Sequence, residues 1–182
     1  MKFLLKLKHW QLFLLMFVLP FVLDIVSTVT SAATQNMTVI FIVLPVIMLL
    51  MMIFLFGWFY AIGNGLNEKL PESLQLNISR FRAFLFIPIG YILLLFILMF
   101  MMINMAPRTP DAGFVLIILP LHLFSMFCIF YSLYFVSKSL KTMELQREVT
   151  FSDYAGEFVL IWVFPIGVWF IQPRINKIFE ND

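Results

Sequence analysis

The chain has 182 residues, of which 63% are hydrophobic and 12% are charged, and its formal net charge at pH 7 is +2. Average soluble domains are only about 45–50% apolar, so a water-soluble fold of this length could not hide such a surface. The small net charge leaves no electrostatic footprint for nucleic-acid binding. The single cysteine, Cys128, excludes an intrachain disulfide and a zinc cluster. The composition therefore predicts an all-α integral membrane protein whose main partner is the lipid bilayer.

Long uncharged windows divide the chain into pieces of membrane length. Residues 25–67, 83–107 and 112–137 contain no charge, and a bilayer core of roughly 30 Å needs about 20 apolar helical residues. We expect four transmembrane helices in a single membrane domain that takes in residues 1–182, with spans at about 10–29, 38–62, 83–105 and 113–136. The glycines of Gly63-Asn64-Gly65 are interpreted as a helix stop, and the prolines of residues 107–111 as a turn. The fourth helix is expected to continue for about two turns beyond its span.

The first span allows two interpretations. Lys2, Lys6 and Lys8 precede its apolar run, and Ser31-Ala32-Ala33 follows, as in a cleaved secretory signal. Asp24 interrupts the run, and the length of the stretch favours an uncleaved span. The next segment begins outside in both cases, so the downstream topology is the same.

The placement of lysine and arginine orients the spans. Nine of these residues occupy the N-terminus, the second loop and the fourth loop: Lys2, Lys6, Lys8, Lys69, Arg80, Arg82, Lys138, Lys141 and Arg147. The two other turns contain only Arg108. Because cytoplasmic loops of membrane proteins carry an excess of lysine and arginine, we expect a cytoplasmic N-terminus in a bacterial inner membrane.

The last apolar segment, residues 154–172, allows two topologies. Only 16 residues separate Glu157 from Arg174, which is short for a crossing. A re-entrant hairpin turning at Pro165-Ile166-Gly167 would keep the C-terminus cytoplasmic, and the charge bias favours it. A weak repeat, in which Phe86-Ile87-Pro88-Ile89-Gly90 resembles Val163-Phe164-Pro165-Ile166-Gly167, favours a short fifth crossing instead. Beyond this segment, Gln172-Pro173-Arg174 is expected to break the helix before a short amphipathic tail.

Two groups of polar residues are candidate sites. Asp24 and His122 both fall roughly 10–13 Å below the outer interface at 1.5 Å per residue, and ionisable residues inside a bilayer are functional hypotheses. We expect them to pair, either on a proton or cation path or as a structural hydrogen bond between two spans. Glu157 is expected at the inner boundary with Arg80 and Arg82, as an ion pair or solvated.

The C-terminal third carries one further pattern: Phe151-Ser152-Asp153-Tyr154, Glu157-Phe158, Phe164-Pro165-Ile166-Gly167-Val168-Trp169 and Gln172-Pro173-Arg174-Ile175-Asn176. With these residues the chain resembles small multi-pass membrane proteins of bacteria, a family without an assigned activity. The resemblance implies an inner-membrane location and assigns no role to any residue.

The sequence contains no phosphate-binding glycine loop, no His-Glu-x-x-His and no paired catalytic carboxylates. We therefore expect no catalytic, cofactor or metal site, and a non-catalytic accessory or scaffold subunit of a membrane complex. Its expected partner is another membrane protein or a second copy of the chain, and not nucleic acid. The alternative function is a small transporter or channel subunit that uses the Asp24/His122 pair.

Overall fold

The computed structural model describes residues 3–36, 38–104 and 112–180. These residues form the helices α1 (Phe3–Lys6), α2 (His9–Phe13), a π-helical turn (Leu14–Val18), α3 (Leu19–Thr34), α4 (Thr38–Lys69), a 3₁₀ turn (Glu72–Leu74), α5 (Ile78–Asn104), α6 (Ala112–Leu145), α7 (Phe151–Trp162) and α8 (Phe164–Phe179). The all-α prediction is confirmed for this part of the chain. The turn expected at residues 107–111 lies outside the described residues.

Among the described residues, four helices are long and apolar enough to cross a membrane: His9–Thr34, Ile42–Lys69, Ile78–Leu98 and Leu116–Leu145. They match the four expected spans. The first helix passes from α-helix to a π-helical turn and back just before Pro20. A proline has no N–H to donate within a helix, and local π-helical adjustments help a membrane helix to tolerate one.

The expected helix stop at Gly63-Asn64-Gly65 is wrong, because α4 continues to Lys69. Both glycines serve close packing instead. A Cβ on Gly63 would lie 2.5 Å from the ring of Phe81, and one on Gly65 would lie 2.9 Å from the side chains of Leu5 and Phe179. Small residues let neighbouring elements approach a membrane helix. The predicted extension of the fourth helix is confirmed, since α6 ends at Leu145.

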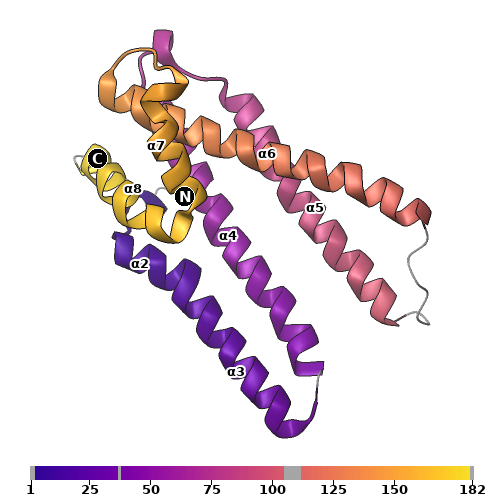
Figure 1. Cartoon of the computed structure of the whole chain (residues 1–182). Helices are drawn as coiled ribbons and strands as arrows, with labels where there is room; N and C mark the ends of the chain where they lie inside the picture. Colours follow the sequence, from indigo (N-terminus) through magenta and orange to yellow (C-terminus); the bar gives the residue numbers. More distant parts are fainter. Residues whose placement is uncertain (1–2, 37, 105–111, 181–182) are drawn as a thin grey trace.

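Two helical hairpins, α3–α4 and α5–α6, meet at one end and diverge toward the other, and both chain termini lie at the end where the hairpins meet (Figure 1). The buried side chains follow this geometry. On α6 they occur from Ser125 onward, whereas Leu116, Leu119 and Leu123 are exposed. The core therefore sits at the end where the two hairpins meet, which we call the joined end. Each hairpin extends from it with an apolar surface that a bilayer could cover.

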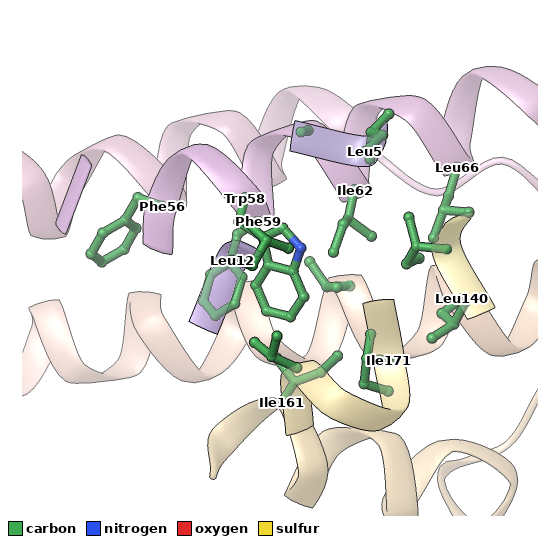
Figure 2. Close-up of a cluster of buried hydrophobic side chains, with 14 of the residues drawn as sticks. Leu5, Leu12, Phe56, Trp58, Phe59, Ile62, Leu66, Leu140, Ile161 and Ile171 are labelled. Carbon is green, nitrogen blue, oxygen red and sulfur yellow. The ribbon is translucent and has the colours of Figure 1, made fainter. Parts of the chain in front are cut away.

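Trp58 of α4 is the largest fully buried side chain of this core. Figure 2 shows it surrounded by side chains from segments far apart in the sequence, among them Leu12, Ile161 and Ile171. The N-terminal segment, α4, α7 and α8 thus share one hydrophobic cluster. Burial of such side chains contributes about 1.5–3 kcal/mol each relative to exposure in water.

The last segment forms two helices joined at Val163, whose φ of −87° and ψ of 57° interrupt α7. The turn reaches the middle of α4, because Phe164 lines a pocket of about 200 Å³ together with Met52 and Leu55. Helix α8 then returns to the joined end, where Lys69 Nζ at the end of α4 donates to the carbonyl oxygen of Ile178 at 2.9 Å. The pair α7–α8 therefore starts and finishes at the same end of the molecule (Figure 1).

The break expected at Gln172-Pro173-Arg174 is also wrong. Helix α8 runs through Pro173 to Phe179. The apolar face expected to form an amphipathic tail is covered by the protein itself, since Ile175 is 0% exposed and Phe179 is 8% exposed. The tertiary bonds of residues around Pro173, described next, offset the single backbone hydrogen bond that a proline removes from a helix.

Candidate functional site

The structure does not bring Asp24 and His122 together. Asp24 is half-buried on α3 and lines a pocket of about 260 Å³ with residues of α4 such as Ile47 and Met48. His122 is exposed on α6, and its Nδ1 lies 3.2 Å from Tyr91 Oη of α5. No hydrogen bond or ion pair joins the predicted pair in the described part of the chain. The similar depth predicted for the two residues does not make them neighbours, because α3 and α6 belong to different diverging hairpins (Figure 1).

Glu157 lies at the joined end, and its partners are Lys141 and Arg174 rather than the expected Arg80 and Arg82. Its Oε1 accepts from Lys141 Nζ at 3.0 Å and from Arg174 Nη2 at 2.8 Å. The Glu157 residue is only 7% exposed. Because an unpaired buried charge is strongly destabilising, these two donors are what allow the carboxylate to lie there.

The network extends to Glu144, on the last turn of α6. Arg174 donates from Nε and Nη2 to the two oxygens of Glu144 at 2.6 and 2.5 Å. This bidentate geometry is the strongest form of an arginine–carboxylate pair. Two acids and two bases from α6, α7 and α8 balance each other, so the cluster fastens the α7–α8 hairpin to α6.

The arginines expected beside Glu157 lie elsewhere. Arg82 donates from Nε to Asn64 Oδ1 at 2.8 Å, which joins α5 to α4. Asn64 in turn donates to the carbonyl oxygen of Tyr60 at 2.7 Å. Arg80 is exposed, and its backbone N–H bonds Asn77 Oδ1 at 3.0 Å. The pairing with Glu157, which a shared place at the inner boundary suggested, is thus replaced for Arg82 by a bond between neighbouring helices.

Gln172 forms the second polar centre of the joined end and is 0% exposed. Its Oε1 accepts from Trp58 Nε1 at 2.8 Å, and its Nε2 donates to the carbonyl oxygen of Leu7 at 2.8 Å. Asn176, one turn later on α8, donates to the carbonyl oxygens of Leu5 and Leu7 at 2.9 and 3.0 Å. The break between α1 and α2 leaves carbonyl groups without intrahelical donors. The side-chain amides of Gln172 and Asn176 donate to these carbonyl groups instead.

The spacing of Gln172 and Asn176 was the sequence pattern that could have identified this centre. Residues four apart lie on one face of a helix, so two amides in this register indicate a shared acceptor. Because a helix break was predicted at Pro173, the two amides were not expected to lie on the same helix.

Helix α7 begins with a capping box in which Thr150 is the N-cap residue and Asp153 is its partner. The backbone N–H of Thr150 donates to Asp153 Oδ2 at 2.8 Å, and Arg147 Nη2 donates to Asp153 Oδ1 at 2.9 Å. The Thr150 backbone bond and the Arg147 guanidinium stabilise the charged carboxylate and lower the pKa of Asp153 to about 2. Asp153 therefore stays ionised at any ordinary pH, in a capping-box geometry that begins the helix.

The described residues contain no group of three or more His, Cys, Asp or Glu side chains that could hold a metal ion. Comparisons of the chain with family models, with curated proteins and with solved structures found no match. Glu157, Gln172 and Asn176 bond donors and acceptors of the same chain and so connect the N-terminal segment, α4, α6 and α7 to α8. The buried hydroxyls of Ser139 and Thr142 on α6 have no hydrogen-bond partner in the part of the chain that the structure describes.

Proposed function

We propose that the chain is a non-catalytic, polytopic protein of the bacterial inner membrane that acts as an accessory or scaffold subunit of a membrane complex. The observation that carries this proposal is that two buried polar side chains of the joined end are already bonded within the chain. Glu157 and Gln172 each bond to donors or acceptors of the same chain. A general acid or base must instead reach the group on which it acts. These residues support a rigid platform rather than a reaction.

The topology that goes with this function has both termini in the cytoplasm and α7–α8 as a re-entrant hairpin. Three features support it: the hairpin starts and finishes at the joined end, Phe164 reaches only the middle of α4, and Lys6, Lys8 and Lys177 line one pocket at the joined end. An interrupted backbone is tolerated at such depth where protein surrounds it, and Phe164 packs on Phe17 with ring centroids 6.0 Å apart. A C-terminal alkaline phosphatase fusion should be inactive. An active fusion would require a fifth crossing.

The alternative of a small transporter or channel subunit rests on a pair of residues that lie in different hairpins. Asp24 faces α4 and His122 bonds Tyr91, so the described part of the chain does not form the pair on which this function depends.

The test is purification of the full chain from its native membrane in a mild detergent, followed by mass spectrometry. A membrane protein recovered in stoichiometric amount is the expected result. The purified chain should also be reconstituted into liposomes beside an Asp24→Asn variant. If no partner is recovered and the liposomes show a proton or cation flux that Asp24→Asn abolishes, the transporter function replaces the accessory one.

A further inference from the structure

A pocket of about 610 Å³ opens at the joined end between the N-terminal segment and the last turns of α8. Its lining contains Leu5, Lys6, Lys8, His9, Pro173, Asn176, Lys177, Phe179 and Glu180. The pocket exists because the chain breaks between α1 and α2, and because Asn176 holds the broken end against α8. Its volume falls in the range of about 300–1,000 Å³ that is typical of small-molecule sites.

The charge of the pocket is strongly one-sided. Three lysines face one carboxylate, Glu180. Within the described residues Lys6, Lys8 and Lys177 make no ion pair, in contrast to Lys141 and Arg174 nearby. Three ammonium ions and one carboxylate leave an excess of two positive charges, 3 − 1, among the lining residues. Such an excess attracts an anion, and lysine is a common partner of phosphate.

The pocket also has an apolar wall. Leu5 and Phe179 are buried core residues at its edge, and His9 lies against Trp169 with ring centroids 4.8 Å apart. His9 is the first residue of the first helix that is long and apolar enough to cross a membrane. Trp10 and Trp169 are each 45% exposed, as expected for tryptophans in the interfacial belt of a membrane protein. The pocket therefore lies where lipid headgroups would meet the protein.

We propose that this pocket binds the phosphate-bearing headgroup of an anionic phospholipid from the leaflet next to the chain termini. The lysines hold the phosphate, and Leu5 and Phe179 contact the glycerol and the first part of the acyl chains. Basic pockets beside membrane helices are a recurrent way to recognise anionic lipids. A soluble phosphate compound would use the lysines but would gain nothing from the apolar wall.

The experiment uses the full chain in detergent, with bound lipid counted by native mass spectrometry. Dioctanoyl phosphatidylglycerol is the probe, dioctanoyl phosphatidylcholine is the neutral comparison, and inorganic phosphate is the competitor. We expect one phosphatidylglycerol per chain, at least about tenfold weaker retention of phosphatidylcholine, since it lacks a net charge, and no displacement by phosphate.

A double variant, Lys8→Gln with Lys177→Gln, should weaken phosphatidylglycerol binding about 25-fold, which is about fivefold for each lysine. The matched control, Arg80→Gln with Lys138→Gln, removes the same charge outside the pocket and should change binding less than about threefold. Lys8→Arg with Lys177→Arg should restore binding, which separates loss of charge from loss of fold. Equal loss in the control, equal binding of phosphatidylcholine, or displacement by inorganic phosphate would each overturn the lipid site.

Discussion

Replacing Gly167 by alanine should open the α7–α8 hairpin. A Cβ at this position would lie 1.8 Å from the carbonyl oxygen of Leu160 and 2.5 Å from its carbonyl carbon. Real Cβ contacts are essentially never shorter than 3.0 Å, so the two helices must separate locally by at least about 1.2 Å. The obstructing atoms belong to the backbone, so no change of rotamer can relieve the contact. Overpacking typically costs about 1–3 kcal/mol, and we expect the upper half of that range here.

Gly156→Ala provides the matched control in the same hairpin. Gly156 lies within α7, and a Cβ there would meet nothing within 4 Å. Alanine is favoured over glycine inside a helix by about 0.5–1 kcal/mol, so this variant should be as stable as the parent or slightly more stable. Thermal unfolding of both variants in one detergent, followed by circular dichroism, measures the difference. If Gly167→Ala unfolds at the same temperature as Gly156→Ala, the close approach of α7 and α8 is not a feature of the folded protein.

Three further predictions concern the polar contacts of the joined end. Gln172→Leu should destabilise the chain by about 1–3 kcal/mol, since it leaves the buried N–H of Trp58 without an acceptor; denaturation followed by tryptophan fluorescence should show it, and an unchanged midpoint would mean that this bond adds nothing. Glu157→Gln should destabilise the chain by about 1–3 kcal/mol. Glu144→Gln, which removes the charge of a more exposed pair, should destabilise it by less than about 1 kcal/mol. The reverse order of the two variants in the same thermal assay would contradict the deeper burial of Glu157. Because the pKa of Asp153 is lowered to about 2, its contribution to the stability of α7 is complete above about pH 4 and is lost as the pH falls toward about 2. Asp153→Asn should therefore reduce the acid sensitivity of α7, measured by hydrogen exchange. Equal acid sensitivity of the variant and the parent chain would exclude this role.

The polar contacts of the joined end could be predicted only in part. Glu157 was expected at the inner boundary, since it lies between the fourth loop and the last apolar segment, and that position stays a prediction. Its partners were not expected, because Lys141 and Arg174 reach it from α6 and α8. The rotation of each helix about its own axis decides such pairings, and an almost uniformly apolar sequence contains little information about that rotation.

The two similar stretches around Pro88 and Pro165 show where local sequence stops deciding structure. Both read Pro-Ile-Gly, yet α5 continues through Pro88 while the chain turns at Val163. The surroundings differ: a Cβ on Gly90 would meet nothing within 4 Å, whereas Gly167 lies against the backbone of α7. The tight turn coincides with a close backbone approach of the neighbouring helix α7, which is found at the second stretch and not at the first.

The sequence by itself determined that four helices are long and apolar enough to cross a membrane, because uncharged runs of this length bury their backbone polar groups only as helices. Tertiary structure alone decided that the hairpins diverge, that Asp24 and His122 lie apart, and that Gln172 and Asn176 bind the broken N-terminal segment. The physical reason is that hydrophobicity specifies whether a segment enters an apolar environment and how long it must be. Which side chains meet depends on interhelical contacts between nearly equivalent apolar faces, where small residues and a few buried donors and acceptors select the packing.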